Sequence, residues 1–254
     1  MCKKESGYFS KFSNGRVESY DEYASLFSTA SNHQLIGEST AIYLRDPETP
    51  KKIYDANPNA KIIIMLRDPI ERAFSHYLMY IKNGYEKISF SKKLEKYLQT
   101  ETNDNFHNYI IMPSYYFNSV SEYISIFGKD KIKIIIYEEF AKNTEKSVSE
   151  ILDFLNLDIE LPTNLSKKYN DFSHPLGKSQ NFVISNKLSK TLGRRLLPKS
   201  TRVSIKNLLS DKKSKPELSH NDISNLSDLF DKDVKDIQKL ISKKLQWKNF
   251  PETF

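Results

Sequence analysis

Arg67 is the clearest candidate for a ligand-binding residue, because it ends the apolar run KIIIMLR and is followed by Asp-Pro. Pro69 is typical of the first position of a helix, so a strand is predicted to pass directly into a helix here. Ligands of open parallel sheets bind where strands end, and a helix N-terminus favours anions. Arg67, this N-terminus and the Ser75 hydroxyl therefore predict a site for one phosphate-like anion. In the alternative, Arg67 caps the sheet and pairs with Asp68 or Glu71.

A second segment, LGKS at residues 176–179, contains the Gly-Lys-Ser of phosphate-binding loops. The first glycine that such a loop requires is replaced by Phe172, and no apolar strand precedes the segment. The sequence therefore excludes a Walker motif here.

Apolar runs and helical periodicity predict the elements that position these residues. Three runs are predicted as strands buried on both faces: residues 33–37, 61–66 and 131–136. Helices are predicted at residues 46–57, 69–82 and 116–127, along the stripe at 148–155, and after Ser219. Gly128 is a predicted C-cap, and Ser219 with Asp222 has the spacing of a capping box.

Strands that alternate with helices predict an α/β domain with a mainly parallel sheet flanked by helices on both faces. The pattern weakens between residues 156 and 216, where loops and short helices are expected to fold over the sheet. A length of 254 residues is compatible with one domain.

Composition narrows the range of partners. The net charge is +7, but acidic residues are scattered among the lysines, and no basic stripe with interleaved aromatics marks a nucleic-acid binder. One cysteine, Cys2, excludes an internal disulfide. No apolar run approaches the roughly 20 residues of a membrane span, and the start lacks the apolar core of a signal peptide. We expect a cytoplasmic protein with no membrane span.

Several segments together resemble one known family. An Arg at a strand end, Asp-Pro, a Ser eight residues after the Arg and a Tyr two further on resemble the 3′-phosphate-binding motif of sulfotransferases. This frame consists of Arg67, Asp68, Pro69, Arg72, Ser75 and Tyr77. GESTAIYL at residues 37–44 is similar to the family's Gly-Glu-Lys-Ser-Pro-x-Tyr segment, and KKESGYFS to its Lys-Glu-x-His-Phe-Phe segment. Residues 114–127, 131–157 and 215–247 resemble later family segments in the same order.

The resemblance is to the carbohydrate and heparan sulfate branch of the sulfotransferases. It implies a P-loop-NTPase-like three-layer fold over residues 1–254. It also implies transfer of a sulfuryl group from 3′-phosphoadenosine 5′-phosphosulfate to a hydroxyl of a carbohydrate or glycan, which leaves adenosine 3′,5′-bisphosphate. No metal ion is implied.

Residue roles follow from the same resemblance. It implies that Arg67 and Ser75 bind the 3′-phosphate, while Arg72 either joins them or braces the fold from the helix interior. Glu38, at the end of its predicted strand, matches the glutamate that acts as general base in the glycosaminoglycan branch. The alternative for Glu38 is a structural acceptor for nearby backbone amides.

Two further nucleotide ligands are implied. Tyr116 matches the tyrosine of the family's Ser-x-Tyr helix, although its place in an apolar stripe fits packing equally well. Lys178 lies in a segment that resembles a late loop closing over the nucleotide in heparan sulfate sulfotransferases. A solvated loop lysine is the alternative for Lys178.

One family element finds no match. The Lys-x-Gly-Thr-Thr loop that cradles the donor's 5′-phosphosulfate, with its strand, precedes the first matching residue, Lys3. We therefore expect a domain that is incomplete at its N-terminus, poorly stable alone and weakly active or inactive, because this loop stabilises the leaving group. The alternative is a catalytically inactive family member that binds a nucleotide or glycan.

Overall fold

The computed structural model describes residues 5–13, 15–31, 35–83, 85–100, 104–161, 165 and 216–251. The chain divides into two compact units. Unit 1 comprises the described residues within 1–68, 115–165 and 229–254, and unit 2 comprises those within 69–114 and 166–228.

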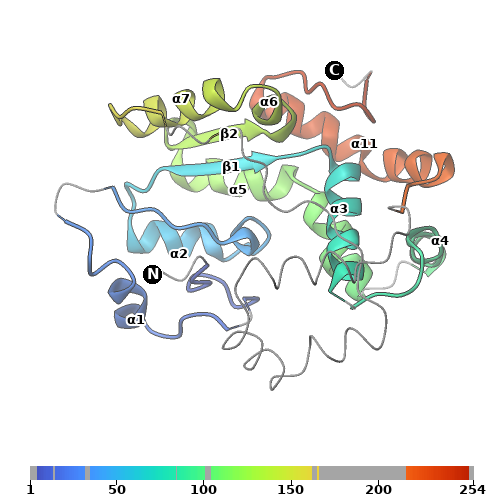
Figure 1. Ribbon diagram of the computed structural model, residues 1–254, viewed down its shortest axis with the longest axis horizontal. Helices are drawn as coiled ribbons and strands as arrows, with labels where there is room; N and C mark the ends of the chain where they lie inside the picture. Colours follow the sequence, from blue (N-terminus) through green and yellow to red (C-terminus); the bar gives the residue numbers. More distant parts are fainter. Residues whose placement is uncertain are drawn as a thin grey trace, which may run out of the picture. The chain divides into compact units, whose positions relative to one another are not determined.

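A two-stranded parallel sheet lies at the centre of unit 1. Strand β1 (Ile62–Leu66) pairs with β2 (Ile132–Ile136), so that Ile62 lies opposite Ile132 and Leu66 opposite Ile136. Figure 1 shows helix α5 (Phe117–Phe127) on one side of this sheet and α7 (Thr144–Leu155) on the other. The strands predicted at 61–66 and 131–136, and the predicted α/β class, are confirmed.

The prediction that these strands are buried on both faces is wrong for β1. Ile64 and Leu66 are 5% and 0% exposed, whereas Ile63 and Met65 are 40% and 44% exposed. Successive side chains of a strand point to opposite faces, and the helix on the second side, α7, contacts β2. The outer face of β1 is therefore left partly open to solvent.

The predicted strand at residues 33–37 is also wrong in its described part, while positions 33 and 34 lie outside the described residues. Residues 35–37 have no regular secondary structure, and Leu35 and Ile36 are 58% and 52% exposed. A strand requires a ladder partner. In the described ranges, β1 and β2 form a two-stranded sheet with each other, and this segment does not join it.

Unit 1 contains further described helices besides α5 and α7. They comprise α1 (Tyr20–Ser25), η1 (Ala41–Leu44), α2 (Thr49–Ala56), η4 (Lys129–Lys131) and α6 (Tyr137–Lys142). Helix α2 begins three residues later than predicted, with Pro50 in its first turn. Gly128 ends α5 with a φ of 81°, which confirms the predicted C-cap, because glycine adopts positive φ without a Cβ penalty.

The described part of unit 2 contains α3 (Pro69–Lys82), whose predicted bounds are confirmed at both ends. Other elements among its described residues are α4 (Phe90–Thr100), the π-helix η2 (His107–Ile111) and η3 (Met112–Ser114). The ring of Phe90 lies 5.4 Å from Phe74, 5.1 Å from Tyr77 and 5.4 Å from Phe106. This aromatic cluster is the core that joins α3 to α4.

The long helix α11 (His220–Ile241) begins in unit 2 and ends in unit 1. The predicted capping box is confirmed, because Ser219 N–H donates to Asp222 Oδ2 at 3.0 Å and Asp222 N–H donates to Ser219 Oγ at 3.1 Å. The stripe Leu226, Phe230, Val234 and Ile237 is fully buried.

Adjacent positions of β1 give a direct test of the one-sided core. Leu66→Ala is expected to lower the free energy of unfolding by about 2–5 kcal/mol, because it opens a cavity at a fully buried site. Met65→Ala, on the open face, is expected to cost less than about 1 kcal/mol. Urea denaturation of both variants measures the difference. Equal losses would show that the two faces are buried alike.

Candidate functional site

Arg67 directly follows β1, its side chain is half-buried, and two contacts hold it in place. Its guanidinium lies over the Tyr137 ring, 4.9 Å from the centroid, and its carbonyl accepts a hydrogen bond from the Tyr116 hydroxyl at 2.8 Å. A guanidinium that stacks by its face keeps its N–H donors at the edge of the plane. The arrangement suits an anion that approaches this edge.

Four residues next to Arg67 form a strand-end network: Asp68, Glu138, Trp247 and Asn249. Asp68 is 1% exposed, and its Oδ2 accepts from the Asn249 backbone N–H at 3.3 Å and side-chain amide at 2.9 Å. Asp68 N–H donates to Glu138 Oε1 at 3.1 Å, and Trp247 Nε1 donates to Glu138 Oε2 at 3.0 Å. The network ties the ends of both strands to the segment after α11.

Tyr116 is 2% exposed and stands at the N-cap of α5. Its backbone N–H donates to Asp233 at 2.7 Å, and that of Phe117 donates to the same carboxylate at 3.0 Å. Burial raises the pKa of Asp233, and these two hydrogen bonds partly offset the rise. Because the Tyr116 hydroxyl holds the Arg67 carbonyl, the structure supports a positioning role, and direct contact with a nucleotide stays a prediction.

In unit 2, Arg72 is half-buried and bridges α3 to the following turns. Its Nε donates to Ser114 Oγ at 2.6 Å, another guanidinium nitrogen lies 3.3 Å from His76 Nδ1, and a third donates to the Ile110 carbonyl. These partners favour the bracing role over phosphate binding.

The other two positions of the frame on α3 differ in exposure. Tyr77 is buried, its hydroxyl donates to the Ile88 carbonyl at 2.6 Å, and burial raises its pKa to about 12. Ser75 is exposed. Ser75 therefore stays available to a ligand, while Tyr77 serves the core of unit 2.

Glu38 lies in an irregular segment of unit 1, not at a strand end as predicted. Its Oε1 accepts hydrogen bonds from Ser6 Oγ at 2.7 Å and from Thr40 Oγ1 at 2.6 Å. Burial, followed by the Glu38 carboxylate, raises the pKa of the Tyr23 phenol. Within the part of the chain that the structure describes, the segment pairs with neither strand of the sheet, and hydroxyl groups donate to the carboxylate.

The structure adds Glu5, which the sequence analysis did not single out. Glu5 is exposed and immediately precedes Ser6, the donor to Glu38. Its signal was present in the KKESGYFS segment, where an acidic residue precedes a turn with Gly7 at a φ of 65°. Ser6 is therefore next to Glu5 in the sequence and hydrogen-bonded to Glu38 in the structure.

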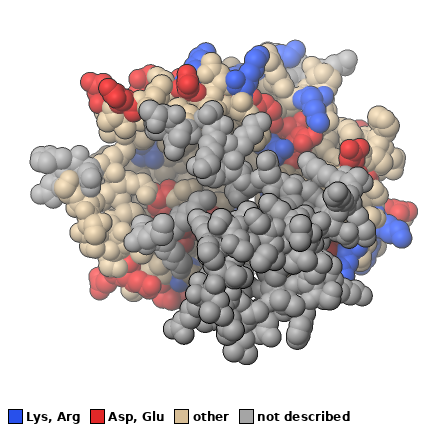
Figure 2. All heavy atoms as spheres, in the orientation of Figure 1, with Lys and Arg blue, Asp and Glu red and all other residues tan. Residues whose placement is uncertain are grey.

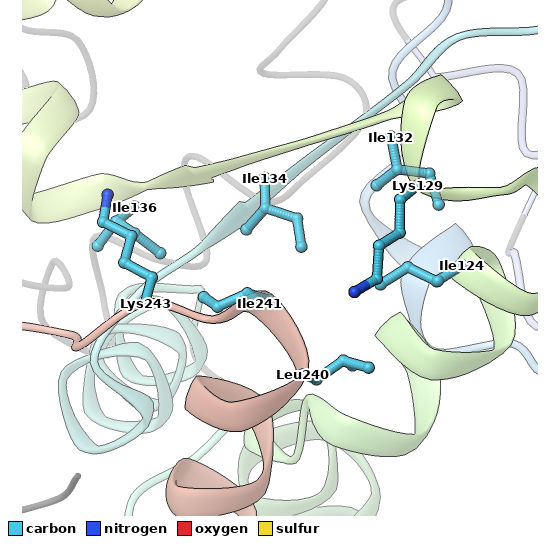
Figure 3. A pocket seen from close by; sticks show the side chains of 8 residues that line it. All are labelled: Ile124, Lys129, Ile132, Ile134, Ile136, Leu240, Ile241 and Lys243. Carbon is cyan, nitrogen blue, oxygen red and sulfur yellow. The ribbon is translucent and has the colours of Figure 1, made fainter.

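A cavity of about 220 Å³ in unit 1 contains none of the predicted site residues. Figure 3 shows that the isoleucines of β2 and the ends of α5 and α11 line it, together with Lys129 and Lys243. Lys243 Nζ donates to Glu139 at 2.6 Å. The predicted anion site is therefore separate from this aliphatic cavity.

The distribution of surface charge and a search for metal-binding groups identify no further site residues among the described residues. Figure 2 shows basic and acidic side chains interspersed over the described part of one face. Within the described ranges, no group of three or more His, Cys, Asp or Glu residues is placed to hold a metal ion. None of the described helices combines the length and apolar character of a membrane-spanning segment.

Lys178 lies outside the described residues.

Comparisons with known proteins agree on one family. The family model described as "Sulfotransferase domain" matches residues 12–238. The chain is 37% identical over 75 residues to the membrane-associated sulfotransferase kil1 of Dictyostelium discoideum, covering 30% of this chain and 16% of that protein. It is 28% identical over 122 residues to human carbohydrate sulfotransferase 15, covering 41% of this chain and 22% of that protein.

A solved structure extends the likeness to the fold. The crystal structure of a sulfotransferase from Alicyclobacillus acidocaldarius matches with a TM-score of 0.66 and 24% identity, covering 96% of this chain and 85% of that chain. At this identity the match shows the fold alone. The matched part spans about a fifth or less of the length of the two curated relatives.

The strand-end network is open to a stability test. Asp68→Ala is expected to lower the free energy of unfolding by about 2–4 kcal/mol, because it leaves the Asn249 donors without their charged acceptor. Asp55→Ala, which removes an exposed i,i+4 ion pair with Lys51, is expected to cost about 0.5 kcal/mol or less. Urea denaturation compares the two variants, and a cost for Asp68→Ala no larger than the control would contradict the role assigned to the network.

Proposed function

The chain belongs to the sulfotransferase domain family, and from this membership we propose that it transfers a sulfuryl group from 3′-phosphoadenosine 5′-phosphosulfate to a hydroxyl of a carbohydrate or glycan. The observation that carries the proposal is Arg67, whose guanidinium stacks on Tyr137 at the end of a parallel strand. The name of the human relative, carbohydrate sulfotransferase 15, supports the acceptor class. The proposal treats residues 1–254 as one sulfotransferase domain, and a cytoplasmic location stays a prediction.

Binding of the donor's 3′-phosphate is assigned to the segment that runs from β1 into α3. Arg67 supplies charge-assisted N–H donors, and Ser75 supplies an exposed hydroxyl two turns into the helix. Arg72 is assigned to bracing α3, since Ser114 and the Ile110 carbonyl hold its guanidinium. Tyr116 is assigned to positioning Arg67. Lys178 stays a candidate nucleotide ligand.

In the proposed reaction, the acceptor oxygen forms a bond to sulfur while the bond between sulfur and the 5′-phosphate oxygen breaks. The acceptor's proton passes to a carboxylate. Two side chains are candidates for this base. Glu38 is the residue implied by the resemblance, and its Oε1 already accepts hydrogen bonds from Ser6 and Thr40. Glu5 is exposed and has the more accessible oxygens.

Arg67 is tested by titrating adenosine 3′,5′-bisphosphate into the protein in a calorimeter. Arg67→Ala is expected to weaken binding about 10- to 100-fold, since charge-assisted hydrogen bonds contribute about 1.5–3 kcal/mol. Ser75→Ala is expected to weaken it about 3- to 10-fold. Arg16→Ala, which removes an exposed partner of Glu18, serves as the control and leaves affinity unchanged. Equal affinity of Arg67→Ala and wild type would remove Arg67 from the site.

The base is identified by comparing Glu38→Gln with Glu5→Gln. Loss of the general base is expected to lower kcat about 10²- to 10⁴-fold, while the other variant keeps most of its activity. Melting temperatures of both variants separate chemistry from folding, because Glu38 also holds Ser6 and Thr40. If kcat is unchanged in both variants, neither carboxylate is the base. Nucleotide binding without any turnover in wild type would instead indicate an inactive binding protein.

A further inference from the structure

Three tyrosines in unit 1, Tyr8, Tyr20 and Tyr23, form a partly exposed aromatic surface, here named the tyrosine platform. The rings of Tyr8 and Tyr23 stack with centroids 4.9 Å apart and an interplanar angle of 18°. Tyr20 lies 6.4 Å from each of them and is 60% exposed. Large aromatic side chains gathered at a surface mark a binding site more often than scattered ones do.

The platform is held in place from below and along the chain. Tyr20 and Tyr23 lie on α1 (Figure 1), whose N-cap Ser19 accepts a hydrogen bond from Glu22 N–H at 3.1 Å. The buried ring of Phe9 packs edge-on against Tyr8 at 4.9 Å and against Tyr23 at 5.2 Å. A platform fixed in this way loses little conformational entropy when a ligand binds.

Hydrogen-bonding groups lie at the edge of the platform. The backbone N–H of Phe9, the residue beneath the platform, donates to the Tyr43 hydroxyl at 3.2 Å, which links the platform to the hydrogen bonds around the Glu38 carboxylate. Ser6 and Thr40 donate to the same carboxylate, and the Tyr43 hydroxyl lies 3.1 Å from Ser6 Oγ. The site therefore combines flat apolar surface with a carboxylate and several hydroxyls.

This combination matches the chemistry of a pyranose. A sugar ring has an apolar C–H face that packs on aromatic rings, and its rim of hydroxyls donates to carboxylates and exchanges hydrogen bonds with other hydroxyls. A nucleotide fits less well, because the negative charge of Glu38 opposes its phosphates. The aliphatic cavity of Figure 3, with its two lysines, lacks both the aromatic faces and the carboxylate acceptor.

We propose that the tyrosine platform binds a sugar ring of the acceptor and directs a hydroxyl of that ring toward the Glu38 carboxylate. That the bound sugar is the acceptor rests on the proposed function, whereas saccharide binding itself can be measured without turnover. Tyr20 supplies exposed stacking surface, and Tyr8 and Tyr23 supply the fixed base beside Glu38.

The test uses the whole chain and two probes, cellohexaose and an unsulfated chondroitin hexasaccharide, in NMR titrations with wild type, Tyr20→Ala and Tyr20→Phe. Tyr20→Ala is expected to weaken binding of the better probe about 3- to 10-fold, through loss of one aromatic stacking surface. Tyr20→Phe keeps the ring and is expected to bind within about twofold of wild type. Tyr85→Ala, which removes a 75% exposed tyrosine of unit 2, is the matched control and is expected to leave binding unchanged.

Several results would overturn the platform. They are a wild type that binds neither probe at its solubility limit, equal affinity of Tyr20→Ala and wild type, or equal loss in Tyr85→Ala. Titration of adenosine 3′,5′-bisphosphate into the same variants separates this inference from the proposed function. Saccharide binding that depends on Tyr20, without nucleotide binding, keeps the platform and removes the sulfotransferase proposal. Sulfuryl transfer with an acceptor KM that is unchanged in Tyr20→Ala keeps the sulfotransferase proposal and removes the platform.

Discussion

Two carboxylates, Asp68 and Glu138, hold together the carboxyl end of the parallel sheet, where Arg67 follows β1. Asp68 is almost fully buried, which is costly for a charged group unless donors surround it. Asn249 supplies two such donors, and Glu138 joins the Asp68 N–H to the Trp247 indole. A strand that ends in this network cannot move along its partner without leaving buried polar groups unsatisfied.

Arg67 itself is fixed through its backbone and the face of its guanidinium. The Tyr116 hydroxyl donates to the carbonyl at 2.8 Å, and the Tyr137 ring lies under the guanidinium, 4.9 Å from its centre. The buried acid beside it, Asp68, serves the fold through Asn249.

Local signals explain which parts were predictable from sequence. Pro69 at the start of α3, Gly128 at positive φ and the Ser219–Asp222 capping box act within a few residues, and the structure confirms each. The segment at 35–37 shows the limit, because apolar composition does not reveal whether a ladder partner exists. The contacts of Glu38 with Ser6 and of Tyr116 with Arg67 span 32 and 49 positions, so only the fold reveals them.

Helix α5 links the two chemical environments of unit 1. At its N-cap, Tyr116 holds the carbonyl of Arg67, and further along the helix the buried hydroxyl of Tyr123 donates to the Tyr43 carbonyl at 3.2 Å. Tyr43 belongs to η1, and its hydroxyl lies 3.1 Å from Ser6, the donor to Glu38.

The two tyrosines on α5 are seven positions apart, which corresponds to two helical turns and about 10 Å along the axis. One rigid element therefore spaces the cationic strand end from the carboxylate beside the tyrosine platform. Because Asp233 caps the same helix at Tyr116 and Phe117, loosening that cap would disturb both environments together, whereas a change at the platform surface would affect only one of them.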